Sequence, residues 1–173
     1  MAIRPANLSD IPAMLEIYRP FVENTTVSFE YTVPTQAEFI QRFQAHRGMP
    51  WLVWEENRQV LGYTYAGLPW SRAAYRWCAE SSVYLAPQAR GRGIGRQLMT
   101  TLEEELSSLG YRRLYAVVTG ENQASIAFHQ ALGFVPRAEF PQCGWKFGRW
   151  LSVVWLEKTL ASGGCPQAFP QTW

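Results

Sequence analysis

Apolar residues near the start of the chain recur with a helical period. Four of them would share one face of a helix: Ile11, Met14, Leu15 and Tyr18. Ser9 or Asp10 can cap the start of this helix. Thr35 and Glu38 have the spacing of a capping box, in which each residue bonds the other's backbone N–H. The pattern therefore predicts two amphipathic helices, the second over residues 36–47.

Alternating or continuous apolar runs of strand length follow. The predicted strands cover residues 2–4, 51–55, 59–66, 79–85, 113–118 and 151–159. Two further helices are predicted at about 93–109 and 122–132, each followed by a glycine. This order, without a linker or repeat, predicts one mixed α/β (α+β) domain over residues 1–160.

Residues 161–173 are rich in glycine and proline and are predicted to form an irregular C-terminal tail. Phe169 and Trp173 offer apolar surface for packing on the body or on a partner subunit. We expect a loose tail, because chain ends are ordered only when they are tied down.

Composition narrows the class of protein. The 173 residues are 47% hydrophobic and 17% charged, which is typical of one globular domain. A net charge of +2 is too small to attract nucleic acid, and no apolar run reaches membrane-spanning length. Three cysteines without metal-like spacing suit a reducing compartment, and two histidines exclude a multi-histidine metal site. We therefore expect a cytoplasmic protein without a metal, nucleic-acid or membrane partner.

The junction between the strand at 79–85 and the helix after it carries the densest chemical signal. Glycines and arginines alternate there: Arg90, Gly91, Arg92, Gly93, Ile94, Gly95 and Arg96. Glycines let the backbone approach a ligand, and a helix start offers free N–H groups and partial positive charge. Arginines add forked donors for phosphate oxygens. The junction therefore predicts a cradle for a phosphorylated cofactor.

The spacing of these residues separates the cofactor classes. Gly91, Gly93 and Gly95 do not fit the dinucleotide motif G-x-G-x-x-G, and no P-loop Lys-Ser or Lys-Thr follows. The pattern R-x-x-G-x-G from Arg90 to Gly95 resembles the acyl-CoA pyrophosphate loop, Q/R-x-x-G-x-G/A, of the GNAT superfamily of N-acetyltransferases. A glycine-rich connection with surface arginines is the alternative if the loop is taken alone.

A second strand–helix unit, residues 114–134, strengthens the resemblance. The positions that match the GNAT pattern are Asn122, Ser125, Ile126, Phe128, Leu132, Gly133 and Phe134. The resemblance runs from Ile3 to about Leu160. It implies the GNAT fold, a mixed and mostly antiparallel sheet that is splayed at the cofactor site and flanked by helices.

Within this superfamily the chain is most similar to phosphinothricin and methionine sulfoximine acetyltransferases and L-amino-acid N-acyltransferases. Residues 26–31, 65–85 and 145–160 carry that likeness. Members acetylate the α-amino group of small amino acids or toxic analogues, usually as homodimers. Phe147 and Leu151 stand where phosphinothricin-specific members tend to carry histidines, which argues against strict phosphinothricin specificity.

The resemblance implies acetyl-CoA as the acyl donor and assigns its contacts. They are Val83, Tyr84 and Leu85 of the strand, the loop residues 90–96, and Asn122 and Ser125. Backbone N–H groups of the strand would bind the thioester oxygen and the pantetheine amides.

Glu80 is the candidate general base. It precedes the cofactor strand in an apolar setting near Tyr75 and Trp77, which would raise the pKa of its carboxyl group. It also matches the acidic residue given this role in phosphinothricin acetyltransferases. The alternative is a salt bridge between Glu80 and Arg72 or Arg76.

His129 is the candidate proton donor to the leaving thiolate. Many GNAT enzymes place a tyrosine seven residues after the pantetheine-binding asparagine, and Asn122 plus seven is His129. Imidazole exchanges protons near neutral pH. A capped or packed histidine is the alternative, and a role in positioning the base or the substrate is also open.

Candidate acceptor contacts come from the cations and aromatic residues near these motifs. An amino-acid carboxylate calls for a cation, and aromatic residues can wall a side-chain pocket. The candidates are Phe29, Arg72, Tyr75 and Lys146.

Other functions fit the sequence less well. A pocket for a polyamine needs several carboxylates near the site, and Glu80 is the one carboxylate that the motifs place there. An aminoglycoside or a protein amino terminus is a further class of acceptor. A non-catalytic acetyl-CoA sensor would need neither Glu80 nor His129.

Overall fold

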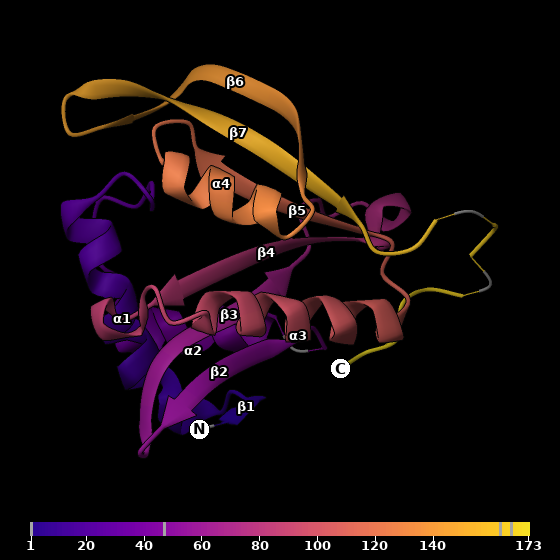
Figure 1. Cartoon of the computed structure of the whole chain (residues 1–173), viewed down its shortest axis with the longest axis horizontal. Helices are drawn as coiled ribbons and strands as arrows, with labels where there is room; N and C mark the ends of the chain where they lie inside the picture. Colours follow the sequence, from indigo (N-terminus) through magenta and orange to yellow (C-terminus); the bar gives the residue numbers. More distant parts are fainter. Residues whose placement is uncertain (1, 47, 163, 167) are drawn as a thin grey trace.

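The computed structural model describes residues 2–46, 48–162, 164–166 and 168–173. Within these ranges, seven strands form one sheet in the order β1-β2-β3-β4-β5-β7-β6 (Figure 1). The strands are β1 (Ala2–Pro5), β2 (Trp51–Glu56), β3 (Gln59–Gly67), β4 (Cys78–Leu85), β5 (Arg113–Thr119), β6 (Val135–Lys146) and β7 (Arg149–Thr159). Neighbouring strands are antiparallel except for β4 and β5, which are parallel. The mixed, mostly antiparallel sheet that we predicted is confirmed.

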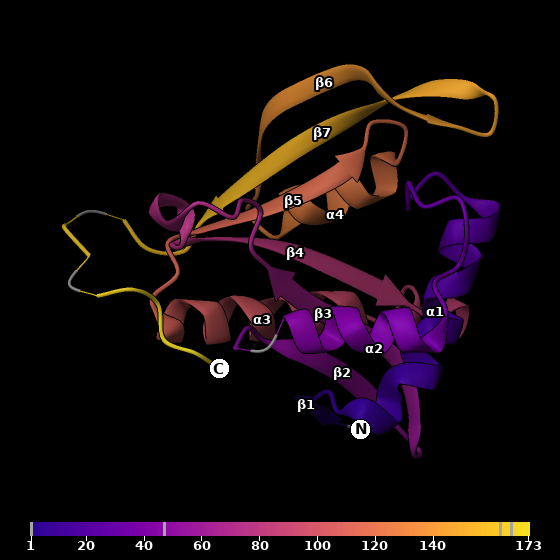
Figure 2. The same ribbon diagram turned by 180° about the vertical axis from the view of Figure 1, so that it is seen from behind.

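Helices cover both faces of the sheet, as Figures 1 and 2 show from opposite sides. The helices are α1 (Ile11–Asn24), α2 (Gln36–Ala45), α3 (Ile94–Leu109) and α4 (Gln123–Ala131). One core joins α1 and α2 to β2 and β3, and the other joins α3 to the opposite face of the sheet. Each face buries an apolar stripe of its helices, which is the main stabilising contribution in such a layered fold.

Helix starts follow the predicted caps, with one shift. The capping box of Thr35 and Glu38 at α2 is formed. At the first helix, Asn7 caps a short 3-10 turn (Leu8–Asp10) that leads into α1, and Asp10 contributes the return bond of that cap. α2 ends at Ala45, and the predicted end at residue 47 lies outside the described residues.

Strand β6 is the element that the sequence analysis missed. It pairs antiparallel with β7 and is irregular between Pro136 and Ala138 and between Phe140 and Gly144. All of its residues from Val135 to Cys143 are exposed, so no alternation of buried and exposed positions marks it in the sequence. Prolines and a glycine, which disfavour strands, removed the remaining signal.

The parallel pair β4–β5 opens into a gap. Its pairing covers only Cys78–Glu80 with 113–115, although both strands continue. Beyond Glu80 the two strands diverge, as Figure 1 shows. Main-chain groups that face the gap have no strand partner there, and such groups need other hydrogen-bond partners. This is the splay that the resemblance implied.

The described residues of the C-terminal tail (161–162, 164–166 and 168–173) form no helix or strand, and its last residues pack on the body instead of lying loose. The ring of Phe169 packs on Trp77 with 4.9 Å between centroids. The backbone N–H of Gln171 donates to Leu109 O at the end of α3, and Trp173 N–H donates to Gly48 O. Trp173 Nε1 also donates to Glu105. The aromatic residues that could pack on the body do so.

No helix among the described residues is long and apolar enough to cross a bilayer. No group of three or more metal-binding side chains converges within the same ranges.

Candidate active site

A cavity of about 520 Å³ lies at the start of α3, between that helix, β4 and α4. The residues that line it are Phe21, Val27, Val83, Leu85, Ala89, Arg90, Gly91, Gly93, Ile94, Gly95, Arg96, Asn122, Ala124, Ser125 and Phe128. The fold therefore brings together both sequence motifs, which lie far apart in the chain. Phe21 and Val27 were not predicted, because apolar residues of a helix end and a loop carry no motif.

The glycine loop supplies the anion-binding end of this cavity. Gly93 is the N-cap of α3 with φ of +76°, and no side chain caps the first turn. Gly91 also has a positive φ of +71°. A Cβ atom at either glycine would meet nothing within 4 Å, so the backbone borders open space. The free N–H groups of the first turn can therefore reach a phosphate oxygen.

The three predicted arginines take different positions. The guanidinium of Arg90 lies 5.4 Å from the ring centroid of Phe21 at the cavity wall. Arg96 also lines the cavity, with only a long contact to Ala131 O. Arg92 forms an ion pair with Glu56 at 2.7 Å and does not line this cavity. Arg90 and Arg96 are therefore the better placed for a diphosphate.

A second, narrow cavity of about 60 Å³ lies in the gap between β4 and β5. Residues 81–84 line one side and 116–119 the other, with Tyr84 among them. It shares Val83, Asn122 and Ser125 with the larger cavity, so the two adjoin. An extended arm that bears amides fits such a gap, because it can bond main-chain groups left without a strand partner.

Asn122 and Ser125 stand where the gap meets α4. The Oδ1 atom of Asn122 accepts the N–H of Ser125 at 3.2 Å and so caps α4. This cap leaves the NH₂ group of Asn122 as a donor toward the gap. One residue therefore serves both the helix and a ligand.

His129 lines the gap and is only 4% exposed. Its Nδ1 atom lies 2.8 Å from the carbonyl oxygen of Ser125. Because a carbonyl only accepts, Nδ1 carries the proton and Nε2 is left with a lone pair. Burial lowers the pKa of His129, although the bond to Ser125 opposes this. The imidazole is thus neutral near pH 7 and suits proton acceptance better than the predicted donation.

Glu80 stands at the closed end of the gap, opposite Tyr115 in the β4–β5 register. Burial raises the pKa of its half-buried carboxyl group. The salt bridge weighed between Glu80 and Arg72 or Arg76 is not formed among the described residues. A desolvated carboxylate without a cation partner has the character of a general base.

Aromatic residues surround the same end of the gap. Trp70 stacks on Trp155 at 5.6 Å, and its ring also contacts Tyr75 at 4.9 Å and Tyr115 at 5.4 Å. Tyr115 shares the face of Glu80, because directly paired residues project to one side of a sheet. Tyr115 and Trp155 were not predicted, since aromatic residues in a strand read equally well as core.

Arg72 is exposed in the loop 68–77, which also carries Tyr75, and this loop leads directly into β4. Phe29 lies in the loop after α1, where its ring packs so close to Gly144 that a Cβ atom there would overlap it. Neither of the two cavities described above is lined by Glu80, Phe29, Arg72 or Tyr75.

Lys146 is placed differently from its prediction as a substrate contact. It is 2% exposed, and its ammonium donates to three carbonyl oxygens at 2.6–2.8 Å. These belong to Val22, Thr25 and Ser28, at and after the end of α1. Since an ammonium has three donors, none is left for a substrate carboxylate. Lys146 instead ties the β6–β7 hairpin to the loop that carries Phe29.

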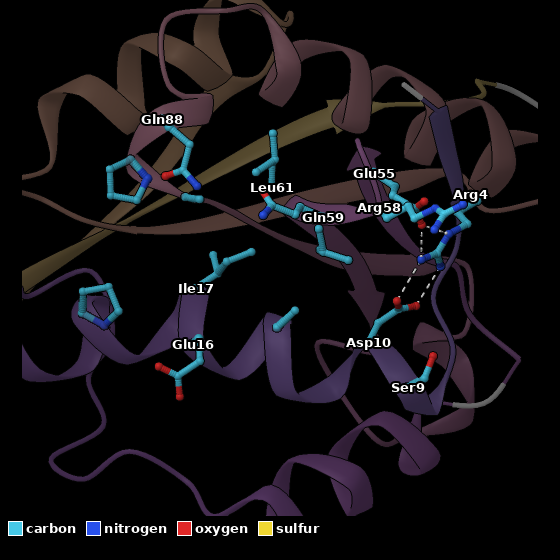
Figure 3. Close-up of a pocket in the computed structure, with 15 residues that line it drawn as sticks. Arg4, Ser9, Asp10, Glu16, Ile17, Glu55, Arg58, Gln59, Leu61 and Gln88 are labelled. Carbon is cyan, nitrogen blue, oxygen red and sulfur yellow. Dashed lines mark hydrogen bonds and ion pairs between the residues drawn. The ribbon is translucent and has the colours of Figure 1, made fainter.

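A larger cavity of about 730 Å³ lies elsewhere, between α1 and the β2–β3 hairpin (Figure 3). None of the predicted site residues lines it. The guanidinium of Arg4 bridges Asp10 and Glu55 there, and its donors are used in these bonds and in one to Pro5 O. Its size therefore does not make it the better candidate site.

Comparisons with known proteins show the family to which the chain belongs. A model of the Acetyltransferase (GNAT) family matches residues 11–134. Phosphinothricin N-acetyltransferase of Alcaligenes faecalis is 38% identical over 164 residues, which cover 93% of this chain and 83% of that protein. L-methionine sulfoximine/L-methionine sulfone acetyltransferase of Salmonella typhimurium is 37% identical over 171 residues, or 97% of this chain and 99% of that protein.

Solved structures share the fold. A GNAT superfamily phosphinothricin acetyltransferase from Sinorhizobium meliloti, solved in complex with AcCoA, is 38% identical with a TM-score of 0.90. The match covers 98% of this chain and 92% of that one. The chain therefore belongs to the GNAT family of acetyltransferases. The resemblance drawn from the two motifs is confirmed.

Proposed function

We propose that this chain transfers the acetyl group of acetyl-CoA to the primary amine of a small amino acid or of a toxic analogue of the phosphinothricin or methionine sulfoximine type. Membership of the family makes the chain an acetyl-CoA-dependent N-acetyltransferase. The acceptor class and the ternary-complex mechanism are the new parts of the proposal. The relatives named for such substrates support it, since they match over nearly the whole chain.

One observation carries the proposal: the cofactor cavity runs into the β4–β5 gap, and the gap ends at Glu80. Acetyl-CoA supplies an activated thioester. Gly93 and the start of α3, with Arg90 and Arg96, would hold its diphosphate. Val83, Leu85 and the NH₂ group of Asn122 would hold the arm that leads to the thioester. The acetyl group would then lie at the end of the gap next to Glu80.

The chemistry requires a free amine, and Glu80 would take the proton from the acceptor's ammonium. The amine nitrogen then bonds the acetyl carbon as the carbon–sulfur bond breaks. Backbone N–H groups of β4 that face the gap would stabilise the charge on the carbonyl oxygen. Holding both reactants in line supplies up to about 7–11 kcal/mol of the barrier reduction.

The leaving thiolate needs a proton. His129 is neutral and has its lone pair on Nε2, so it carries no proton there to donate. It would therefore accept a proton at Nε2 and pass it on to the thiolate. The acceptor nitrogen loses two protons: Glu80 takes the first before attack and passes it to solvent. The second leaves the nitrogen as the carbon–sulfur bond breaks and is the one that neutralises the thiolate. In the proposal Arg72 binds the acceptor carboxylate, with Tyr75 and Phe29 as walls, whereas Lys146 has no such role.

A homodimer completes the proposal. Three aromatic side chains of the β6–β7 hairpin are exposed: Phe140, Trp145 and Trp150, at 49%, 47% and 58%. Aromatic residues gathered on one exposed strand pair are typical of an interface. We assign the acetyltransferase domain to residues 1–160 and the cytoplasm as its location.

The test is thiol release from acetyl-CoA in the presence of free amino acids, methionine sulfoximine and phosphinothricin, with spermidine and a tripeptide as other amines. We expect turnover with at least one amino acid or analogue, and the acetylated product by mass spectrometry. Turnover confined to spermidine or the peptide would refute the acceptor class. Binding of acetyl-CoA without any turnover would make the chain a sensor.

A further inference from the structure

The loop between β3 and β4 is held by few contacts. Residues 70–76 are all exposed, and none of their side chains makes a hydrogen bond or ion pair within the described ranges. The main-chain bonds inside the loop, from Tyr75 to Arg72 and from Arg76 to Ala73, do not reach the body. We name residues 68–77 the acceptor loop, because it carries Arg72 and Tyr75.

Two aromatic contacts fix the acceptor loop at its two ends. At the first end Trp70 packs on Tyr115 and Trp155 of the sheet. At the second end Trp77 packs on Phe169, with ring centroids 4.9 Å apart and planes inclined by 30°. The second contact comes from the C-terminal tail, far away in the sequence.

The tail contact involves more than one pair of rings. The guanidinium of Arg76 lies 5.0 Å from the ring centroid of Phe169, within the range of a cation–π interaction. Trp77 Nε1 also donates to the carbonyl oxygen of Ala168 at 3.3 Å. Phe169 therefore contacts the last two residues of the acceptor loop, directly before β4.

The tail is itself fixed on the other side of Phe169. Gln171 N–H donates to Leu109 O at 2.8 Å, and Trp173 reaches both Gly48 O and Glu105. We define residues 168–173 as the C-terminal strap. Because the strap is anchored on α3 and beside α2, it can transmit the rigidity of the body to the acceptor loop.

We propose that the C-terminal strap positions the acceptor loop, with Phe169 as the positioning residue, so that Arg72 and Tyr75 are held for the acceptor. This rests on the proposed function, since Arg72 is assigned to the acceptor carboxylate there. Phe169 touches neither substrate nor cofactor cavity. Its loss should therefore weaken acceptor binding while leaving acetyl-CoA binding intact.

The test compares Phe169→Ala with Phe169→Trp, which keeps an aromatic ring, and with Gln171→Ala. The last variant alters the same strap but keeps Phe169 and the main-chain bond at position 171. For Phe169→Ala we expect the acceptor KM to rise by roughly fivefold to twentyfold. We expect kcat to change by less than about twofold and the Kd for acetyl-CoA to stay the same, because the chemical groups remain in place. The other two variants should resemble the parent.

Limited trypsin digestion gives a second readout that does not depend on activity. Arg72 and Arg76 are cleavage sites within the acceptor loop, and cleavage needs local opening. Cleavage there should be faster in Phe169→Ala than in the parent or Gln171→Ala, with other sites unchanged. Unchanged cleavage, or an unchanged acceptor KM, would overturn the proposal. A parent protein without turnover would refute the proposed function instead, while digestion would still test the strap's contact with the loop.

Discussion

Glu80 is half-buried and has no cation partner among the residues that the structure describes. A desolvated carboxylate disfavours its charged form, so the pKa of Glu80 lies above its ordinary value of 4.5. The raised pKa brings the carboxylate of Glu80 closer in basicity to the amine whose ammonium form it would deprotonate. The sequence suggested the apolar setting, but only the folded chain places Tyr115 opposite Glu80 and Trp155 against Tyr115.

The pH dependence of the reaction should report this group. Glu80 accepts a proton only when ionised, so kcat/KM should fall as the pH drops through its raised pKa. We expect the acidic limb to lie above pH 4.5.

Glu80→Gln should lose most of the maximal rate, on the order of 100-fold or more, with the Kd for acetyl-CoA unchanged. A Gln variant with the parent's rate and the same acidic limb would remove Glu80 as the base.

The carboxyl group of Glu80 should also make the stability of the fold depend on pH. Stability should fall as the pH rises, whereas kcat/KM should rise. Its folded-state pKa is above its unfolded value, so folding favours the protonated form. The favourable contribution is present below about pH 4.5 and is lost as the pH rises through the folded pKa. At pH 7 the buried carboxylate therefore destabilises the fold, and Glu80→Gln should raise the melting temperature. A lower melting temperature at pH 7 and no change at pH 4 would contradict this sign.

Candidate residues could be chosen from the sequence where a motif restricts the residue type. Gly93 and Asn122 line the cofactor cavity and Glu80 stands at the end of the gap, while their roles stay predictions. Lys146 was assigned to the substrate because a cation near aromatic residues fits a carboxylate. The carbonyl groups that hold it lie more than a hundred residues earlier, and no sequence pattern indicates that contact.

At the scale of elements, Lys146 joins β6 to the loop after α1. Lys146→Met should keep the apolar stem but leave Val22, Thr25 and Ser28 carbonyls without their donor. We expect a loss of roughly 2–4 kcal/mol in the free energy of unfolding, since bonds to a charged donor are lost while its burial cost is also removed. Denaturant unfolding measures this.

Arg137→Met provides the matched control on the same strand. Arg137 is exposed and pairs with Glu157 at 3.3 Å, so its loss should cost less than about 1 kcal/mol. Equal effects of the two substitutions would show that the clasp around Lys146 contributes no more than a surface ion pair.

Helices and strands could be predicted where one buried face makes apolar residues recur at regular intervals along the sequence. β2 and β3 have strong apolar runs, and the faces of α1 and α3 follow the helical repeat. β6 gave no signal because it is an exposed edge strand with Pro136, Pro141 and Gly144, held by pairing with β7 rather than by burial. The gap between β4 and β5 came only from the resemblance, since strand separation leaves no local pattern.

At the scale of the whole molecule, the exposed aromatic residues of the β6–β7 hairpin support self-association. Sedimentation equilibrium should give a mass of about twice the 19.8 kDa chain. Replacing Phe140 and Trp150 with serine should shift the population to monomer, whereas Leu8→Ser, at another exposed apolar position, should not. A monomeric parent at micromolar concentration would refute the dimer.

The C-terminal tail and the larger cavity are two features whose interpretation depends on the whole fold. Phe169 and Trp173 look like a loose end in the sequence, but α3 and the acceptor loop give them surface to pack on. The larger cavity in Figure 3 has volume, but its Arg4 is bound to Asp10 and Glu55, and none of the predicted site residues lines it. Chemistry therefore locates the candidate site better than size does.

Hydrogen–deuterium exchange with saturating acetyl-CoA tests the position of the site most directly. Bound diphosphate and arm should slow amide exchange in 81–85, 91–97 and 117–125, which flank the gap and the start of α3. Protection confined to α1 and the β2–β3 hairpin, or protection nowhere, would contradict the account.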